Sequence, residues 1–361
     1  MRFGLVIYGS LEFLSGGFLY DRTLVEHLRR QGDQVEVISL PWRSYSRSLL
    51  DNLDGGLRRR LTHTGVDLLL QDELAHPSLF RLNHRLRRRV SYPLVGIVHH
   101  LRCRENHPPW KNRFYRWVEG RYLRSLDGQI CVSHTTLKDV ARLQGRPRPQ
   151  VVAYPGGDRL PGSLSPEEIT QRTQKPGPLK IIFVGHLIPR KGLHTLLAAL
   201  ARLPRGSWRL AVAGSLTVDP AYVRSVNWQM AALGLTDGVE LLGVLFDQDL
   251  AHHLARSQVL AVPSSYEGLG IIYLEGMRFG LPAIASTSGA AHEVVTHDRD
   301  GFLVPPGDAA ALARSLSLLQ DRERLLSMSL AALRRSENHP TWEEAVARIH
   351  RFLHEFPGLK L

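Results

Sequence analysis

The stretch "QVLAVPSSYEGLGIIYLEGMRFGLPAIAST", from Gln258 to Thr287, contains a strand, a helix and a second strand in close succession. Its first part, "QVLAVPSS", predicts a buried strand, and a glycine-containing turn follows from Tyr266 to Gly270. Residues Ile271 to Phe279 predict a short helix, which "GLP" at 280–282 ends before the next strand. Because strands covered on both faces read as continuous apolar runs, this order predicts a parallel sheet with helical crossovers.

The same alternation continues on both sides of this stretch. Further strands are predicted at 180–186, 208–214 and 238–244, and in the first half at 2–9, 34–40, 66–71, 92–100, 128–133 and 150–156. The segment 159–179 is rich in proline, glycine, serine and charge, which is typical of a linker. The sequence therefore predicts two Rossmann-like parallel-sheet domains, at 1–165 and 179–338, with a linker at 166–178. Ligands of such sheets bind beyond the carboxyl ends of the strands, so we expect a site between the domains.

Length and composition favour a folded protein of two ordinary domains, because 361 residues with 43% hydrophobic content can bury two cores. The apolar run at the N-terminus is too short for a signal peptide, and no later run approaches a membrane span. We therefore expect a cytoplasmic protein. Its two cysteines, Cys103 and Cys131, match no metal or redox spacing and are predicted to be buried or idle thiols.

Positive charge is concentrated in the first half of the chain. The formal net charge is +12, and residues 1–165 contain 26 lysines and arginines against 15 acidic residues. The segment from Arg102 to Ser125 interleaves these cations with aromatic residues, Trp110 and Trp117 among them. Such a surface favours an anionic partner, either a lipid surface, a phosphorylated acceptor or a nucleic acid. The alternative is a solvated arginine-rich surface without a partner.

Two glutamates in the opening stretch suggest the ligand. Glu267 is expected at the carboxyl end of its strand, and Glu275 in the first turns of the following helix. The glycines between them allow a close approach of the backbone, and the free N–H groups of a helix start favour phosphate. Carboxylates would be repelled by that phosphate, so we expect them to bind neutral hydroxyls beyond it. A diphosphate between two hydroxyl-rich groups is a nucleotide sugar. In the alternative interpretation, Glu267 caps the helix and Glu275 is a surface acid.

A second candidate phosphate-binding element is "IIFVGHLIPRKG" at 181–192. It places Gly185 at the end of a strand and Arg190 and Lys191 before the next helix. Two cations at that position can neutralise a diphosphate leaving group. The element is not a P-loop, because the glycine and lysine spacing of that motif is absent.

Together these motifs resemble those of the family 4 retaining glycosyltransferases, which have the two-domain GT-B fold. The resemblance rests on the two glutamates spaced as E-x7-E with the tail that follows, on "FVGHLIPRKG", and on "VVAYPGGD" and "ICVSHTTLKDV". A further match is "SGGFLYDRTLVEHLRRQGDQVEVI" near the start. The similarity covers about Gly16 to Trp342, and it is strong in the second half and diffuse in the first. It also implies that the last helix, at 339–361 with a capping-box pattern at Thr341 and Glu344, packs back on the first domain.

The resemblance implies a role for each matching residue. Glu267 would bind hydroxyls of the transferred sugar, with His99 near that sugar, and Glu275 would bind the ribose. Arg190 and Lys191 would bind the diphosphate. The other implied donor-binding residues lie in the glycine loops and next to them: Gly16, Gly17, Gly185, His186, Gly268, Leu269, Gly270 and Ile271.

Two positions depart from a simple match. His186 stands where the family usually has arginine, and a neutral imidazole binds diphosphate less strongly than guanidinium. Either Arg190 takes over that task or the site is tuned differently. His100 follows His99 directly and is a less favoured substitute for it.

The sequence therefore predicts transfer of a hexosyl group, with retention, from a nucleoside diphosphate sugar to an acceptor hydroxyl. Front-face attack is favoured over a covalent intermediate because both acids are expected to bind hydroxyls. We expect no metal and no cofactor, a UDP- or GDP-sugar donor whose base lies near Val244 to Phe246, and a lipid-linked or anionic acceptor. Peripheral contact with the inner face of a membrane would follow from the basic first half.

Three other functions remain as alternatives from the sequence. An epimerase acting on a sugar nucleotide is compatible with the same architecture, since a fold does not determine a function. A phosphorylase would need a lysine for pyridoxal phosphate, and beyond Lys191 the chain has only Lys360. A non-catalytic nucleic-acid-binding protein is disfavoured, because the basic segments show no helix-turn-helix, zinc-finger or RNA-recognition signature, and we expect no nucleic-acid partner.

Overall fold

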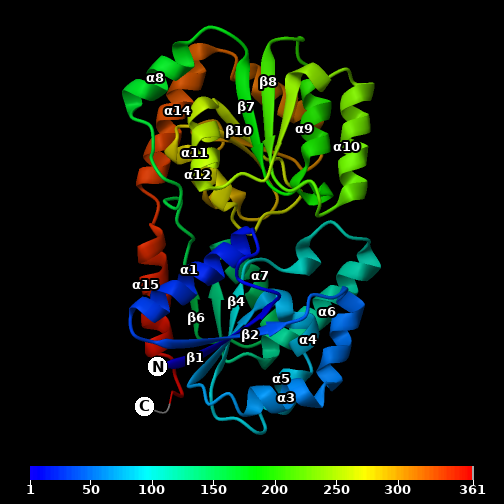
Figure 1. The fold of residues 1–361 in the computed structure, drawn as a ribbon, viewed down its shortest axis with the longest axis vertical. Helices are drawn as coiled ribbons and strands as arrows, with labels where there is room; N and C mark the ends of the chain where they lie inside the picture. The colour runs from blue at the N-terminus through cyan, green and yellow to red at the C-terminus, as the bar shows by residue number, and fades with distance from the viewer. Residues whose placement is uncertain (360–361) are drawn as a thin grey trace. The chain divides into compact units, whose positions relative to one another are not determined.

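The computed structural model describes residues 1–359, which form two compact units. Unit 1 contains Met1–Pro155 together with the segment that begins at Trp342, and unit 2 contains Gly156–Thr341. Each unit is built on its own parallel sheet with helices on both faces (Figure 1). The chain therefore leaves unit 1 once and returns to it at its end.

The sheet of unit 1 has six parallel strands in the order β2-β1-β3-β4-β5-β6. Their bounds are β1 (Arg2–Tyr8), β2 (Gln34–Leu40), β3 (Leu68–Asp72), β4 (Leu94–Val98), β5 (Gly128–Cys131) and β6 (Gln150–Val152). Every residue of β3, β4 and β5 is buried, as the apolar runs predict. The strand order reverses between β1 and β3, because β2 lies on one side of β1 and all later strands on the other.

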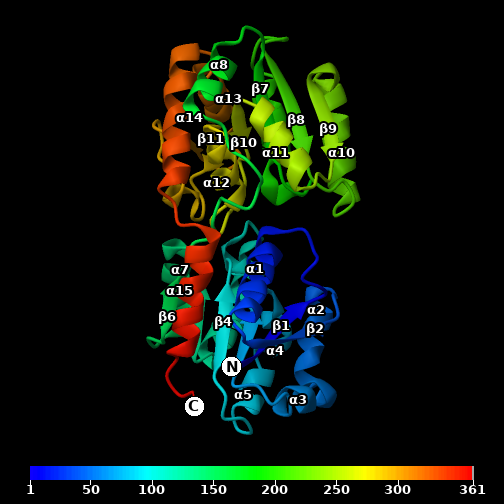
Figure 2. The same ribbon diagram turned by 60° about the vertical axis from the view of Figure 1, so that its left-hand side comes forward.

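The helices of unit 1 are α1 (Gly16–Arg30), α2 (Tyr45–Ser48), α3 (Gly55–Thr62), α4 (His76–Leu79), α5 (Leu82–Leu86), α6 (Pro109–Ser125), α7 (His134–Gln144) and α15 (Trp342–His354). Short 3-10 turns are η1 (Leu49–Leu53), η2 (Glu73–Ala75) and η3 (Arg102–Arg104). Ser15 caps α1 by accepting the N–H of Phe18, so the predicted first glycine loop is in fact the first turn of a helix. The C-terminal helix α15 packs beside α1 (Figure 2).

Unit 2 has a second six-stranded parallel sheet, in the order β12-β11-β10-β7-β8-β9. Its strands are β7 (Leu179–Val184), β8 (Trp208–Ala213), β9 (Val239–Gly243), β10 (Val259–Ala261), β11 (Ala283–Ser286) and β12 (Gly301–Val304). Counted within the unit, this is the 3-2-1-4-5-6 order of dinucleotide-binding sheets. The order reverses between β7 and β10, and at such a point the crossovers on either side leave an opening beyond the strand ends.

The helices of unit 2 are α8 (Pro166–Gln174), α9 (Leu193–Leu200), α10 (Pro220–Ala232), α11 (Asp247–Arg256), α12 (Ile271–Arg278), α13 (Ala309–Leu318) and α14 (Arg322–Glu337). The 3-10 turns are η4 (Pro189–Lys191), η5 (Thr236–Gly238) and η6 (Ala291–Glu293). Helix α14 packs against α8 and α12 (Figure 1). Helix α9 packs with α10 and α13.

The predicted linker at 166–178 is wrong. Most of it forms α8, which Ser165 and Glu168 start with a complete capping box and which buries Ile169 and Thr173 inside unit 2. The proline, glycine and serine content that suggested a linker belongs to the turns on either side of this helix. The boundary between the units accordingly falls earlier, after Pro155 rather than after residue 165.

Cys103 and Cys131 are both buried free thiols, and burial raises the pKa of each, which keeps them protonated. Across residues 1–359, none of the helices combines the length and the apolar character that crossing a bilayer requires.

Candidate active site

The loops that follow β7 and β10 lie side by side at the switch point of the unit 2 sheet. The N–H of Ser265 donates to the carbonyl of Arg190 at 2.7 Å, which joins the two loops directly. Both loops were predicted to bind the donor, and the topology brings them to the same edge. The switch point is where a sheet of this order receives its ligand.

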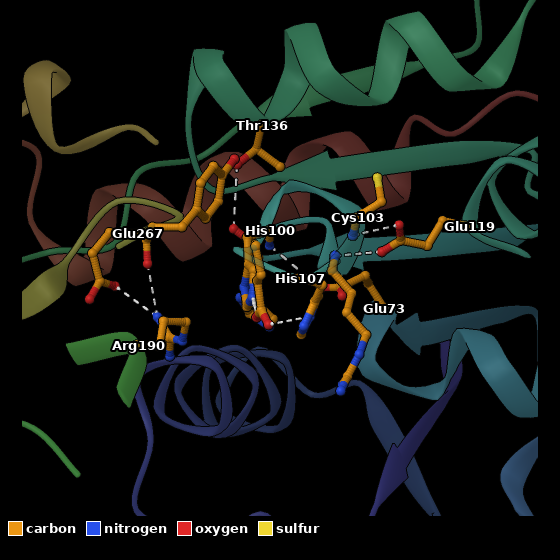
Figure 3. Close-up of polar contacts among 12 residues, drawn as sticks. Glu73, His100, Cys103, His107, Glu119, Thr136, Arg190 and Glu267 are labelled. Carbon is orange, nitrogen blue, oxygen red and sulfur yellow. Dashed lines mark hydrogen bonds and ion pairs between the residues drawn. The ribbon is translucent and has the colours of Figure 1, made fainter. Parts of the chain in front are cut away.

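Glu267 is the centre of this arrangement. Lys191 Nζ lies 2.6 Å from its Oε1, Ser264 Oγ donates to the same oxygen at 2.6 Å, and Arg190 lies 3.7 Å from its Oε2. Figure 3 shows Arg190 turned toward Glu267, and its guanidinium also donates to the carbonyl of Tyr266 at 3.0 Å. Glu267 is 7% exposed, and its carboxylate contacts two half-buried cations and one buried hydroxyl.

The two cations determine the ionisation of Glu267. Burial alone would raise its pKa, but Lys191 and Arg190 more than compensate and lower it to about 2. The pKa of Lys191 moves down instead, because burial and the neighbouring Arg190 outweigh the attraction of Glu267. Glu267 is therefore firmly ionised at neutral pH, and the cluster of two cations and one anion keeps a net positive charge for an anionic ligand.

Gly185 makes room for the lysine of this cluster. Its φ is 155°, and a Cβ added there would lie 3.3 Å from Lys191 Cδ. The aliphatic part of Lys191 thus runs directly over the glycine backbone, so a larger residue would displace the ammonium group. His186 follows and is half-buried, and its contribution to phosphate binding stays a prediction.

The glycine turn after Glu267 leads into α12 as predicted. Gly270 is the N-cap residue in the left-handed conformation, with φ 91°, and no side chain caps the helix. The first N–H groups of a helix have no partner within it, so they are suited to a phosphate oxygen. The alternative in which Glu267 caps this helix is wrong, because the N-cap position belongs to Gly270.

Glu275 is buried, so the alternative interpretation is also wrong in treating it as a surface acid. It is 3% exposed, and Arg159 Nε lies 2.8 Å from its Oε1. Burial raises the pKa of Glu275, and Arg159 opposes that rise. A second nitrogen of Arg159 pairs with Asp247 at the start of α11. The ion pair with Arg159 uses Oε1, and the binding of donor hydroxyls by Glu275 stays a prediction.

Arg159, the partner of Glu275, was not predicted as a site residue, and it lies at the start of the proline- and glycine-rich segment 159–179. It follows a segment that packs closely on α12, where a Cβ on Gly157 would lie 2.7 Å from Leu274 Cβ. The signal was available in the sequence as a cation directly after "PGGD". Ser264, which binds Glu267, was also missed.

Unit 1 has a second group of polar residues at its own switch point, between β1 and β3. His99 follows β4, and its Nε2 lies 3.3 Å from Asp21 Oδ1 of α1. Asp72, at the end of β3, belongs to the same group, and both aspartates are completely buried. A Cβ on Gly17 would lie 3.3 Å from the His99 ring, so the second glycine of the pair is needed for helix α1 to approach His99.

The buried carboxylates change the ionisation of His99. Burial alone would lower the pKa of His99, but Asp21 and Asp72 together raise it. The pKa of Asp72 is raised to about 7, first by burial and then by repulsion from Asp21, with His99 opposing. The buried group therefore favours the protonated forms of both His99 and Asp72. Asp21 and Asp72 were not predicted as site residues.

His100 does not share the surroundings of His99. Its Nε2 lies 2.8 Å from Glu105, and His107 lies 3.2 Å from the same carboxylate (Figure 3). The backbone N–H of His100 points toward Glu73 at 3.5 Å. These contacts anchor the loop after β4, and the preference for His99 over His100 as the site residue stays a prediction.

Comparison with known proteins identifies the family. Two family models match the chain, one described as glycosyl transferase 4-like domain over residues 18–157 and one as glycosyl transferases group 1 over residues 165–335. Between them the two models cover most of unit 1 and most of unit 2.

Characterised relatives match parts of the chain. The O-antigen chain mannosyltransferase B of Escherichia coli is 30% identical over 263 residues, which are 70% of this chain and 66% of that protein. A GDP-mannose-dependent alpha-(1-6)-phosphatidylinositol monomannoside mannosyltransferase of Mycobacterium tuberculosis is 30% identical over 184 residues, 48% of this chain and 46% of that protein. The matched part thus spans about half to two thirds of the length of these relatives.

Solved structures match nearly the whole chain at lower identity. Sucrose-phosphate synthase from Thermosynechococcus elongatus superposes with a TM-score of 0.80 at 20% identity, covering 98% of both chains. Anabaena HepE in complex with UDP-glucose gives a TM-score of 0.77 at 20% identity, covering 99% of this chain and 100% of that one. The fold predicted from the sequence is confirmed, and the chain belongs to the glycosyl transferases group 1 family, with the two-domain GT-B fold.

Proposed function

We propose that this protein transfers a hexosyl group from a nucleoside diphosphate sugar to an acceptor hydroxyl, with retention and without a metal ion. The observation that carries the proposal is the group formed by Glu267, Lys191 and Arg190 at the switch point of unit 2. A diphosphate would compete with Glu267 for the two cations, and the uncapped start of α12 would accept its remaining charge.

The two carboxylates are expected to select the donor. Glu275 would bind the ribose through Oε2, and Glu267 would bind hydroxyls of the sugar once the diphosphate has drawn the cations toward itself. Anabaena HepE was solved with UDP-glucose, and a mycobacterial relative is named as GDP-mannose-dependent. These names support a UDP- or GDP-hexose as the donor. The base is proposed to lie near Val244 to Phe246, where Phe246 is 71% exposed.

Retention is proposed to follow from attack on the same face as the departing phosphate. A carboxylate nucleophile needs to be free to reach the anomeric carbon. Glu267 is held by Lys191 and Ser264 and has a pKa of about 2, which makes it a poor nucleophile. The leaving phosphate would then take the proton of the acceptor. His99 is proposed to bind the transferred sugar as a donor of hydrogen bonds.

Metal independence is proposed because Arg190 and Lys191 supply the positive charge at the diphosphate. Activity that disappears in EDTA and returns with manganese would contradict it.

The acceptor is proposed to be lipid-linked or anionic and to be reached at a membrane surface. Helix α6 exposes Trp110, Phe114 and Trp117, which are 68%, 41% and 46% exposed. These residues lie at i, i+4 and i+7 and therefore on one face of the helix. Lys111 and Arg121 lie over the rings of Trp110 and Trp117, so cations accompany the aromatic face. An aromatic face with adjacent cations suits the interface of an anionic bilayer.

The test is a thermal-shift panel of UDP-, GDP- and ADP-hexoses in EDTA, followed by NMR of the best donor mixed with the protein alone. We expect one nucleotide class to stabilise the protein, the Glu275→Ala variant to lose that shift, and slow donor hydrolysis to give a sugar of the donor's anomeric configuration. Conversion of the intact nucleotide sugar to its epimer would support the epimerase alternative instead. A panel in which no nucleotide sugar stabilises the protein would reject the proposal.

A further inference from the structure

The helix that returns to unit 1 presents two histidines to one buried carboxylate, away from the candidate active site. His350 and His354 lie one turn apart on α15, and their Nε2 atoms are 3.3 Å and 3.1 Å from the same oxygen, Asp33 Oδ2. Asp33 is in the turn between α1 and β2, and its side chain is 3% exposed, whereas those of His350 and His354 are 27% and 36% exposed. The carboxylate is thus fixed and the imidazoles are open to solvent.

The arrangement has the spacing of a transition-metal site. Histidines at i and i+4 share one face of a helix, and the centroids of the His350 and His354 rings lie 4.2 Å apart. With metal–ligand distances of about 2.0–2.2 Å, two ligands of a tetrahedral zinc ion lie roughly 3.3 Å apart. Both nitrogen–oxygen separations agree with that value. All three potential ligand atoms lie within 4.8 Å of one another.

We propose that Asp33, His350 and His354 bind one divalent transition-metal ion of the zinc class, with the remaining position open to water. Neutral imidazole nitrogen and carboxylate oxygen are ligands that Zn²⁺ accepts, and two histidines with one carboxylate are a known set. The second oxygen of Asp33, Oδ1, is 2.6 Å from the amino nitrogen of Met1, which leaves Oδ2 to act as a single ligand. This site is independent of the proposed glycosyl transfer.

Two other groups of acids and histidines in unit 1 are less suitable for binding a metal ion. In the group of Glu73, His76 and Glu119, the two ring nitrogens of His76 already bind the carbonyl of Glu73 and the hydroxyl of Tyr45. Glu119 accepts the backbone N–H groups of Arg102 and Cys103. The group of Asp21, Asp72 and His99 contains the histidine that the proposed function already uses. At Asp33, by contrast, the two imidazoles are open to solvent, and the Nε2 atoms of His350 and His354 both face Asp33 Oδ2.

A metal ion here would join segments that are far apart in the chain. Asp33 precedes the edge strand β2, and the histidines lie more than 300 residues later on the helix that packs against α1. An ion bound to both would hold α15 on unit 1 after the chain has passed through unit 2. The expected consequence is a metal-dependent gain in the stability of this packing.

The test is isothermal titration calorimetry of ZnCl2 into the untagged full-length protein after removal of metals with a chelator. We expect one ion per chain in the wild type. Because loss of an outer-shell partner of a metal ligand costs about 10- to 100-fold in affinity, loss of a ligand should cost at least about tenfold. That loss is expected in Asp33→Asn, in His354→Ala and in the double variant of His350 and His354. The control His252→Ala removes an exposed histidine of α11 and should bind like the wild type.

A second measurement separates lost binding from lost folding. In chelator, each variant should keep the far-ultraviolet circular dichroism of the wild type, and only the wild type and His252→Ala should gain melting temperature on addition of Zn²⁺. Co²⁺ should give a tetrahedral absorption spectrum in the wild type and not in the double variant. The proposal is overturned if the wild type binds no zinc, if the double variant binds it equally well, or if only His99→Ala or His76→Ala abolishes binding.

Discussion

Lys191 Nζ lies 2.6 Å from Glu267 Oε1, although the two residues belong to different loops, 76 positions apart. The pairing joins the loop after β7 to the loop after β10 at the point where the strand order of the unit 2 sheet reverses. Without a ligand, the anion neutralises part of the charge of Lys191 and Arg190. In the proposed function a bound diphosphate would take over that role, and donor binding would then release Glu267 for the sugar.

Replacing Glu267 with glutamine should reduce kcat by about 100-fold, because removing one preorganised polar group at a reaction centre typically costs that much. Donor binding should change less, since both cations remain. Steady-state donor turnover, compared with the control Glu240→Gln at an exposed position of β9, measures this effect. Equal turnover of the two variants would show that Glu267 has no part in the reaction.

The same substitution should change the stability of the protein at acid pH. The pKa of Glu267 is lowered from 4.5 to about 2, so its contribution is fully present above pH 4.5 and is lost as the pH falls toward 2. The shift corresponds to roughly 3 kcal/mol. Urea unfolding of the wild type should therefore weaken over this range more steeply than that of Glu267→Gln. Parallel pH profiles would contradict the ion pair.

Replacing Arg159 with methionine should make donor binding depend on pH. Burial raises the pKa of Glu275 and Arg159 opposes it, so loss of Arg159 leaves burial unopposed. A buried glutamate without a partner can titrate as high as about pH 8–9. Because an ionised carboxylate accepts hydroxyl hydrogen bonds more strongly, the donor KM of the variant should fall as pH rises. The control Arg209→Met, on exposed β8 surface, should keep the wild-type profile.

Asp72→Asn should stabilise the protein at alkaline pH. The pKa of Asp72 is raised from 3.8 to about 7, so the folded protein holds this proton more tightly than the unfolded chain does. Stability is therefore lost as pH rises from about 4 to 7, and asparagine, which resembles the protonated acid, avoids that loss. Urea midpoints at pH 5 and pH 8 measure the difference, with Asp237→Asn as the control. A midpoint for Asp72→Asn below that of the wild type at pH 8 would show that Asp72 is needed as an anion.

The sequence predicted those parts of the site whose position follows from strand order. Glu267, Arg190 and Lys191 all stand just beyond buried apolar runs, and parallel strands bring their carboxyl ends to one edge. Arg159 could not be found in this way, because its partner Glu275 lies 116 residues later and only the folded packing of Gly157 on α12 joins them. Asp21 was missed for a related reason, since an acid within an amphipathic helix reads as a solvent-facing residue.

The exposed aromatic face of α6 should bind anionic membranes. If Trp110 and Trp117 each bury roughly 100 Å² in the interface, each contributes about 2.5 kcal/mol at 25 cal/mol per Å². Losing about 1.4 kcal/mol of this contribution already weakens the affinity for the membrane about tenfold. The double variant Trp110→Ser and Trp117→Ser should therefore pellet poorly with vesicles that contain anionic lipid at low salt.

The matched control for this measurement is Trp228→Ser, which removes a tryptophan that is 74% exposed on α10 in unit 2. It should pellet as the wild type does. Binding should fall with added salt, because Lys111 and Arg121 contribute attraction that is screened within a Debye length. Vesicles without anionic lipid should therefore bind weakly even with all tryptophans present. Wild-type protein that stays in the supernatant at low salt, or a Trp228→Ser variant that loses binding as the double variant does, would reject α6 as the membrane-binding face.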